Sequence, residues 1–391
     1  MIDRERLEQE KKKLDRSYLF KYIDIFAERP GHDIGFYNPR KLLTFNRPFS
    51  FVTGGRKRGK STAMAGLFLI DFLMTGNSFG YIRRDDTELK KSYEKFFSDA
   101  INIINEKESI PFTIYDFYAR GGDYYIDAAG APKTRCGFYL PLKAAQDYKG
   151  AVPDNPVYNI DYDEFMAEES TGYLGSKDTP ETEYNKIMSI YSTYNRCRGH
   201  LLWNRLRMFF TGNLADAYNP IFLKFNISDY YDEKASFIRP KGKMWVVEQV
   251  EPLPEDDDEM LLDFSYQVAD EQQRTYMFGK GGRVDGVDYI RPLPDNAQYI
   301  CTLSFKKKQF GVYRDASTYN YYIGKCKDIG MRPIALDNDS HRDDDLMLVT
   351  KWRDFPIMQV LLDKYRKNQL YFTDSVKKRI FLIYFKLMPD H

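Results

Sequence analysis

The stretch SFVTGGRKRGKSTAM, from Ser50 to Met64, constrains the fold more than any other part of the chain. Its Gly54, Gly59, Lys60 and Ser61 match the pattern G-x-x-x-x-G-K-[S/T], with an apolar strand before the loop and a helix after it. In such a loop the backbone N–H groups and the helix dipole bind a polyphosphate, the lysine reaches its β and γ phosphates, and the hydroxyl coordinates Mg²⁺. The sequence therefore predicts a P-loop that binds ATP and Mg²⁺.

The whole loop is assigned to nucleotide binding. Its residues are Gly54, Gly55, Arg56, Lys57, Arg58, Gly59, Lys60, Ser61 and Thr62. Three consecutive basic residues are more than phosphate binding needs. We interpret Arg56 as a cis sensor that swings between the γ phosphate and Glu164, and we give Lys57 and Arg58 no individual role.

A second apolar run, VYNIDYDEF, ends in the carboxylates that a P-loop enzyme requires. Asp163 is expected to hold the Mg²⁺ shell, and Glu164 to polarise a water for in-line attack on the γ phosphate. Adjacent Asp and Glu favour hydrolysis over kinase-type transfer, although a solvated carboxylate at a strand end also explains Glu164. Asp161 interrupts an otherwise buried strand, and we assign it no role.

Spacing and later polar residues refine the class of ATPase. Lys60 and Asp163 are 103 positions apart, which suits P-loop ATPases with an additional strand, the class of helicases and translocases. The next strand, LRMFFTGN, ends in Thr211 and Asn213, which fit a γ-phosphate sensor or a polar strand end. Arg196 and Arg198 fit arginine fingers for a neighbouring subunit, or a solvated basic face.

From residue 36 onward, short apolar strands alternate with helical stretches, which predicts an α/β fold with a mainly parallel sheet. We divide the chain into an amphipathic helix (1–29), a P-loop ATPase domain (30–254), a linker (255–294) and a smaller α+β domain (295–391). The helix packs on the next domain or docks a partner. The last domain is expected to open with three antiparallel strands and a turn near 315–318.

Composition limits the surroundings more than the function. The net charge of +1 neither supports nor excludes DNA binding. The four cysteines are far apart and form no CxxC pair, which favours a reduced, cytoplasmic setting. We expect no export signal and no membrane span, because the N-terminus is highly charged and the longest apolar run is interrupted by Asp71.

Taken in order, these motifs resemble one family, the DNA packaging ATPases of small podophages of the salasmavirus group, relatives of the large terminase subunits. The resemblance covers most of residues 36–226. It rests on FYNPRKLLTFNRPFSFVTGGRKRGKS (36–61), YIRRDDTEL (81–89), DYDEF (161–165), the arginine pair, TGN (211–213) and NPIFLKFN (219–226), and faintly on KQFGVY (308–313).

The resemblance implies a homo-oligomeric ring, a pentamer in the family, that drives double-stranded DNA through the portal into a preformed capsid in the host cytoplasm. Some relatives add a structural RNA. It places Tyr37, Asn38 and Pro39 near the adenine, and it brings Arg196 and Lys149 in from the adjacent subunit. The family's channel-facing lysine is replaced here by Asp85 and Asp86, so Lys90, Lys91 or Lys177 is expected to contact DNA.

The resemblance also implies an RNase H-like C-terminal domain, and we expect it to be nuclease-inactive. No acid occurs between Tyr299 and Tyr313, and the cluster DNDSHRDDD (337–345) is interpreted as a solvated loop. Its basic run 306–308 and its tyrosines fit a nucleic-acid or portal contact, or an exposed hairpin face. Three alternatives stay open: a terminase with an active nuclease, another helicase-type translocase, and a protein that binds ATP without turning it over.

Overall fold

The computed structural model forms two compact units, residues 1–283 and 284–391, and this division falls inside the predicted linker. The residues that it describes are 16–129, 131–145, 156–166, 183–195, 206–213, 219–227, 230–231, 235–254, 257–269, 274, 291–305, 308–327, 334–336, 347–348, 355–367, 369–373, 377–378 and 381.

The first unit is built on one mixed sheet, as predicted. Its strands lie in the order β3-β4-β5-β2-β6-β7-β1-β9-β8. The six central strands are parallel and comprise β5 (Ala131–Pro141), β2 (Ser78–Arg83), β6 (Val157–Asp163), β7 (Arg207–Gly212), β1 (Phe49–Thr53) and β9 (Trp245–Gln249). Every residue of β1, β7 and β9 is buried, because helices cover both faces of a parallel sheet.

Strand β7 lies between the P-loop strand β1 and the acidic strand β6. Thr53 pairs with Gly212, and Thr211 pairs with Asp163, so the polar ends of the three strands are level with one another. Parallel strands present their carboxyl ends at one edge of the sheet, where ligands bind in open α/β folds. The register therefore gathers the predicted site residues of β1, β6 and β7 at this edge.

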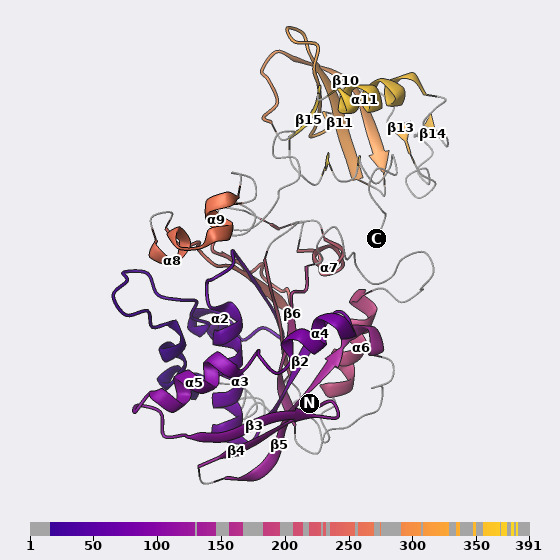
Figure 1. Ribbon diagram of the computed structural model, residues 1–391. Helices are drawn as coiled ribbons and strands as arrows, with labels where there is room; N and C mark the ends of the chain where they lie inside the picture. Colours follow the sequence, from indigo (N-terminus) through magenta and orange to yellow (C-terminus); the bar gives the residue numbers. More distant parts are fainter. Residues whose placement is uncertain are drawn as a thin grey trace. The chain divides into compact units, whose positions relative to one another are not determined.

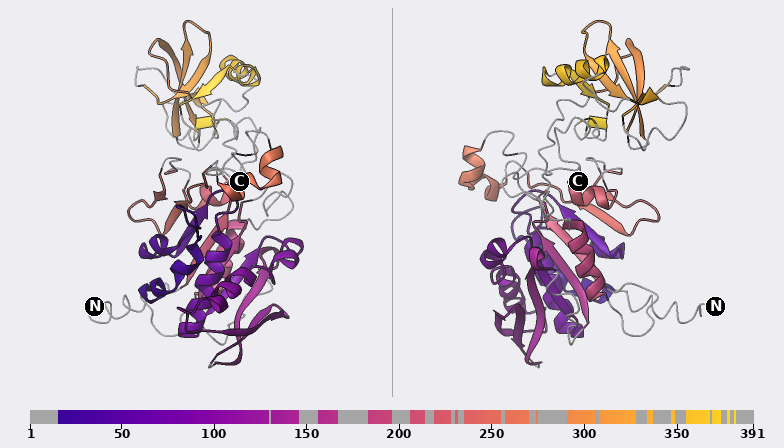
Figure 2. Two further views of the ribbon diagram at one scale, coloured as in Figure 1. Left: turned by 60° about the vertical axis from the view of Figure 1, so that its left-hand side comes forward. Right: turned by 90° about the vertical axis from the view of Figure 1, so that its right-hand side faces the viewer.

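An antiparallel hairpin extends the sheet beyond β5 and was not expected from the sequence (Figures 1 and 2). It consists of β3 (Ile114–Arg120) and β4 (Asp123–Ala128), joined by Gly121 and Gly122, which both have positive φ. Two glycines between alternating aromatic runs are a recognised hairpin signal. At the other edge, the short β8 (Phe237–Ile238) pairs antiparallel with β9.

Helices cover the sheet on both sides (Figure 1). The helices of this unit are α2 (Arg40–Thr44), α3 (Lys60–Thr75), α4 (Asp86–Ser92), α5 (Ser98–Glu106), η3 (Leu142–Ala144), α6 (Glu183–Tyr194), α7 (Pro220–Lys224), α8 (Asp258–Leu261) and α9 (Phe264–Val268). One core joins α2, α3 and α5 to the sheet, and the core on the opposite face contains α6 and α7. Among the described residues, no helix combines the length and apolarity that crossing a bilayer requires.

The N-terminal segment differs from the single amphipathic helix expected for residues 1–29. Residues 1–15 lie outside the described part, and the next residues form two 3₁₀ helices, η1 (Ser17–Lys21) and η2 (Ile23–Ala27). With three residues per turn, a 3₁₀ helix aligns Leu19 with Tyr22 and Ile23 with Phe26, and all four side chains are buried. The segment contributes to the core of the first unit, so the packing interpretation applies to its described residues.

The second unit contains a six-stranded sheet in the order β14-β13-β10-β11-β12-β15. Its strands are β10 (Ala297–Phe305), β11 (Lys308–Asp315), β12 (Tyr321–Gly324), β13 (Ile334–Ala335), β14 (Met347–Leu348) and β15 (Leu370–Phe372). The first three form the predicted antiparallel meander, and Asp315 accepts hydrogen bonds from Ser317 and Thr318 in the predicted turn. Helix α11 (Pro356–Arg366) packs on one face of this sheet (Figure 2).

Gly66, in the middle of α3, allows η2 to pack closely on that helix. A Cβ at this position would lie 2.3 Å from Phe26 Cζ. Alanine normally stabilises a helix by ~1 kcal/mol relative to glycine, but here we expect Gly66→Ala to lower the free energy of unfolding by about 1–3 kcal/mol through overpacking. Urea denaturation measures the change. The double variant Phe26→Leu, Gly66→Ala should lose less than the sum of the two single variants, whereas additive losses would contradict the contact.

Candidate phosphate-binding active site

The P-loop between β1 and α3 needs glycine at two positions. Gly59 has a φ of 72°, and a Cβ there would lie 3.0 Å from Phe36 Cβ. Gly54 has a φ of 155°, and a Cβ there would lie 2.9 Å from Val250 Cβ. Both positions thus combine a backbone conformation that favours glycine with close neighbours. They allow the turns of the loop that leads into the first residue of α3, where the start of a helix attracts anions.

Lys60 folds back over its own loop. Its Nζ donates to the carbonyl oxygens of Gly54 (2.9 Å) and Gly55 (2.6 Å). Burial lowers the pKa of Lys60 to about 8, although Asp163 favours its charged form. The Asn213 amide lies 3.5 Å from Nζ, and the orientation that satisfies both its ends donates to Gly54 O (3.0 Å) and accepts from Arg56 Nε (3.3 Å). The structure thus brings together Lys60, Arg56 and Asn213.

Asp163 is a buried carboxylate at the end of β6, and it accepts hydrogen bonds from three directions. Thr211 Oγ1 on β7 donates to Oδ1 (3.0 Å), and Tyr81 OH on β2 donates to Oδ2 (3.0 Å). The guanidinium of Arg83, also on β2, lies 2.9 Å from Oδ2, and the Glu164 N–H donates to Oδ1 (3.1 Å). A buried charge requires such donors, and here they fix the carboxylate beside the P-loop.

Asp161, which received no role from the sequence, is explained by a count of protons. Thr211 Oγ1 lies within hydrogen-bonding distance of both Asp161 oxygens (3.1 and 3.0 Å) and of Asp163 Oδ1. A hydroxyl donates only one proton, so Thr211 cannot donate to both carboxyl groups. When Asp161 is protonated, it donates to the Thr211 hydroxyl, and Thr211 donates its own proton to Asp163. Burial and the nearby Asp163 charge raise the pKa of Asp161 well above its usual value, in agreement with that arrangement.

Glu164 is held by a residue that the sequence analysis did not single out. Arg83 forms ion pairs with both Glu164 and Asp163, and its Nε donates to Tyr81 OH (2.8 Å). Glu164 itself has a φ of 51°, in the left-handed region, and its side chain is 64% exposed. No local sequence pattern identifies Arg83, because its contacts depend on the pairing of β2 with β6.

The segment predicted near the adenine is hydrogen-bonded to the loop. The Tyr37 N–H donates to Arg58 O (2.7 Å), and its OH donates to Glu248 Oε2 (2.6 Å) on β9. Burial raises the pKa of Glu248 to about 8. Asn38 donates to Asp24 (2.8 Å), and Pro39 precedes α2. These contacts tie the segment to the protein and leave the preceding Phe36 beside the cavity described next.

A cavity of about 660 Å³ opens beside the P-loop and the first turn of α3. Its lining comprises Phe26, Glu28, Phe36, Lys57, Gly59, Ser61, Thr62, Asp99, Ile103 and Leu262. Several aromatic and aliphatic side chains with a few polar groups are typical of a small-molecule site. Ser61 and Thr62, assigned to nucleotide binding, therefore face both the loop and an apolar space.

Two basic residues of the loop, Lys57 and Arg58, contact neighbouring segments of the protein. Lys57, with a φ of 61°, forms an ion pair with Asp263 (2.7 Å), the residue that caps α9. Arg58 donates to Gly35 O (3.1 Å), and burial together with Arg29 lowers its pKa. Neither residue had an individual role from the sequence, and their place in nucleotide binding stays a prediction. In this structure both anchor the loop to neighbouring segments.

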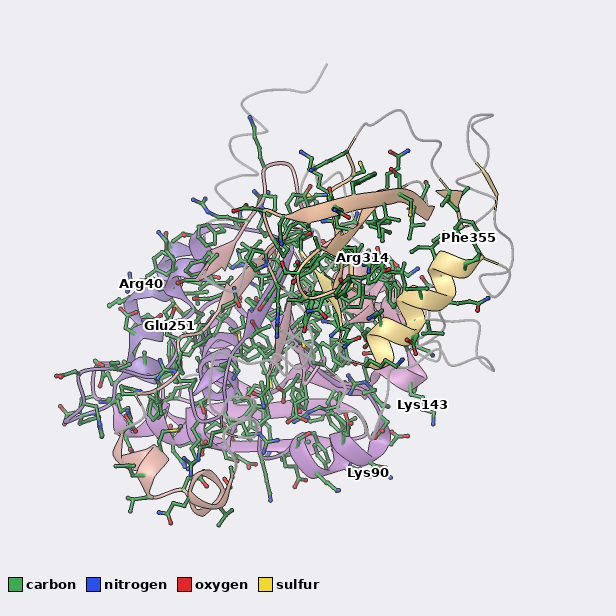
Figure 3. The ribbon with its side chains drawn as sticks, turned by 90° about the horizontal axis from the view of Figure 1, so that it is seen from above. Arg40, Lys90, Lys143, Glu251, Arg314 and Phe355 are labelled. Atoms are coloured by element: carbon green, nitrogen blue, oxygen red, sulfur yellow. The ribbon has the colours of Figure 1, made fainter. Side chains whose placement is uncertain are left out.

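The remaining predicted residues fall on the surface or outside the described part. Lys90 and Lys91 are exposed on α4, and Figure 3 shows Lys90 with Lys143 at the same margin of the first unit. Lys149, Lys177, Arg196 and Arg198 lie outside the described residues, as does the acidic cluster 337–345. Within the described residues, no three His, Cys, Asp or Glu side chains gather as a metal site.

Comparison with known proteins gives a consistent family. The model of the family described as podovirus DNA encapsidation protein (Gp16) matches residues 33–239. The DNA packaging protein of Bacillus phage phi29 is 24% identical over 370 residues, covering 90% of this chain and 98% of that protein. The DNA packaging protein of Bacillus phage B103 is 23% identical over 365 residues, covering 89% and 99%.

Among solved structures, a chain from the bacteriophage Phi-29 viral genome packaging motor assembly superposes with a TM-score of 0.63. It is 22% identical, and the match covers 90% of this chain and 98% of that chain. At this level of identity the match shows a shared fold.

The proton count at Thr211 predicts different outcomes for two isosteric changes. Asp161→Asn keeps a donor for Thr211, so nucleotide hydrolysis should stay within about threefold of the unmodified protein. Asp163→Asn removes the charge beside the P-loop, and we expect a loss of at least about 100-fold, in the range known for groups that stabilise charge at a reacting centre. Steady-state phosphate release measures both. Equal losses in the two variants would contradict the separate roles.

Glu248 predicts a pH-dependent stability. A carboxyl group whose pKa is raised on folding contributes most below its unfolded value of about 4.5. That contribution is lost as the pH rises toward the folded value of about 8. Relative to Glu248→Gln, the protein should therefore lose on the order of a few kcal/mol of stability between pH 5 and pH 8. Chemical denaturation at each pH measures the difference, and parallel curves would contradict it.

Proposed function

The chain belongs to the podovirus DNA encapsidation protein (Gp16) family, and we propose that it is the ATPase of a motor that drives double-stranded DNA into a preformed capsid. The observation that carries the proposal is the meeting of Lys60, Asp163 and Glu164 at one edge of the sheet, on a chain of this family. We propose that it acts in the host cytoplasm at the portal, as a homo-oligomeric ring, pentameric by resemblance, with a structural RNA as a further partner.

The strand order supports the additional-strand class of P-loop ATPase. In that class one strand separates the P-loop strand from the strand of the acidic pair, and β7 lies between β1 and β6. The spacing of 103 residues in the sequence led to the same class. We therefore favour a translocating ATPase over a compact nucleotide kinase.

The donor set fits a hard divalent cation. Carboxylate and hydroxyl oxygens are the ligands that Mg²⁺ prefers, and Asp163 and Ser61 supply them at the P-loop edge. Mg²⁺, when bound, would neutralise charge on the β and γ phosphates. In this structure the guanidinium of Arg83 forms ion pairs with both Asp163 and Glu164. Arg83 must leave Asp163 for a cation to take its place.

In the proposed reaction Glu164 orients the attacking water and Lys60 binds the transferred phosphate. For Glu164 to accept a proton from water, its carboxylate must separate from Arg83, which now compensates its charge. For Lys60 to reach a phosphate, its Nζ must leave the carbonyl oxygens of Gly54 and Gly55. Arg56 and Asn213 are near enough to Lys60 to report whether a γ phosphate is present.

We propose that the base and ribose of the nucleotide occupy the cavity beside Ser61 and Thr62. Phe36 and Leu262 supply apolar surface for a purine ring there. Tyr37, Asn38 and Pro39 then act by positioning Phe36 and the loop above them. Arg196, Arg198 and Lys149 remain proposed contacts from the neighbouring subunit.

We also propose that the C-terminal unit is an RNase H-like domain without nuclease activity. Its meander β10-β11-β12 is extended by β13 and β14, which run parallel to β10, and this order supports that ancestry. Nuclease chemistry of this type needs acids on the first strand, and β10 has none. Mn²⁺-dependent plasmid cleavage by the purified chain would instead favour an active terminase nuclease.

DNA contact is proposed for Lys90, Lys91 or Lys177. Packaging is indifferent to sequence, so the grip on DNA should be made through phosphates, and binding should weaken steeply with salt. The exposed Lys90 and Lys91 lie on α4, the helix that follows the strand of Arg83. A DNA contact there would lie close in sequence to the residue that holds Glu164.

Packaging in vitro tests the proposed function. Purified capsids, DNA and ATP are mixed with the protein, and DNA protected from nuclease is measured. We expect protection with the unmodified chain and at least a tenfold loss with Lys60→Ala or Glu164→Gln, since each removes a group needed for phosphoryl transfer. Glu164→Gln should still bind a fluorescent ATP analogue. Equal protection by the unmodified chain and Lys60→Ala would end the translocase proposal.

A further inference from the structure

Arg84 is a buried arginine next to the catalytic site that neither the P-loop nor the acidic pair accounts for. It follows the end of β2, and its side chain is 4% exposed. One of its terminal nitrogens, NH2, donates to the carbonyl oxygens of Phe165 (2.8 Å) and Glu164 (3.2 Å). Arg84 therefore contacts the backbone of Glu164, whereas its neighbour Arg83 contacts the side chain.

The same guanidinium also contacts α6, through Nε and NH2. Arg84 Nε lies 3.3 Å from Glu183 Oε2, and NH2 lies 3.4 Å from Glu183 Oε1. Glu183 is the first residue of α6, its side chain is 1% exposed, and it also accepts from Tyr162 OH (2.5 Å). Tyr162 lies on β6, one residue before Asp163. The guanidinium of Arg84 thus connects the turn that follows β6 to α6.

This bridge acts on a strained position. Glu164 has a φ of 51°, a left-handed conformation that is unfavourable for a non-glycine residue and persists only where surrounding contacts impose it. The carbonyl oxygens of Glu164 and Phe165 both point to Arg84, so the guanidinium holds the turn that orients the Glu164 side chain. Arginine suits this task because its rigid fork serves several acceptors at once, which an ammonium group does not.

We propose that Arg84 is a positioning residue for Glu164, and that through Glu183 it makes the position of Glu164 depend on α6. The inference rests on the proposed ATPase function. Helix α6 ends at Tyr194, two positions before Arg196, the residue proposed to reach the neighbouring subunit. A displacement of α6 in one subunit therefore alters the alignment of that subunit's own catalytic carboxylate, which gives a route by which subunits of a ring influence one another's turnover.

Arg84→Lys separates this role from simple charge compensation. The lysine keeps a positive charge beside Glu183 but cannot span Glu183 and both carbonyl oxygens. We expect kcat for ATP to fall at least tenfold, because small misplacements of a catalytic group cost about that much or more. The Kd for a non-hydrolysed ATP analogue should stay within twofold, since Arg84 acts on Glu183 and on the backbone of Glu164 and Phe165. Unchanged kcat in this variant would overturn the proposal.

Glu183→Gln provides a second arm if Arg84→Lys folds poorly. It keeps an acceptor for Tyr162 and Arg84 but weakens the link to α6, and kcat should again fall with little change in Kd. Because both residues act through one bridge, kcat of the double variant should fall no further than kcat of the single variant with the larger loss. Full additivity of the two losses, or a parallel loss of ATP-analogue binding, would contradict a positioning role.

The matched control is Arg135→Lys, which changes an ion pair with Asp123 (2.6 Å) between two strands at the far side of the sheet. Its kcat should equal that of the unmodified protein. The unmodified protein and Lys60→Ala are assayed alongside. If neither hydrolyses ATP, the proposed function fails. If the unmodified protein hydrolyses ATP and Lys60→Ala does not, the proposed function stands. If Arg84→Lys then has the same kcat as the unmodified protein, the positioning role alone fails.

Discussion

A buried carboxylate needs donors, and Asp163 takes them from the strand on each side and from its own next residue. Thr211 comes from β7, Tyr81 and Arg83 come from β2, and the Glu164 N–H follows directly in the chain. These contacts are possible only when β2, β6 and β7 are parallel and in the observed register. The electrostatics of the site therefore depend on the strand register. A shift of one strand by one residue would leave the Asp163 charge buried without its donors.

The parts that the sequence predicted are those encoded over short distances. The P-loop, the strand that ends in Asp163, and the three-stranded meander of the second unit each have a local pattern, and each is present. The roles of Arg83, Arg84 and Asp161 were not predicted, because each depends on pairing between strands that are about 80 or 50 positions apart. The β3–β4 hairpin was a different kind of omission, since Gly121 and Gly122 do mark its turn.

The basic residues of the P-loop make different contacts, although they belong to one motif. Lys60 and Arg56 face the site with Asn213, whereas Arg58 holds the segment at Gly35 and Lys57 holds Asp263 at the start of α9. Leu262, the neighbour of Asp263, lines the cavity beside Ser61. The loop is thereby connected to the last described helices of the first unit, so a nucleotide that draws Lys57 toward its phosphates would compete with Asp263 for the same charge.

Arg83 and Arg84 divide one task between two consecutive residues. The first compensates the charges of Glu164 and Asp163, and the second holds the backbone of Glu164 and the buried Glu183. The proposed reaction makes opposite demands on these two arginines, because in it the side chain of Glu164 is released to act on water while its backbone stays in place. Two arginines with separate contacts meet that requirement, whereas one residue performing both roles would lose the alignment of Glu164 at the moment it freed the carboxylate.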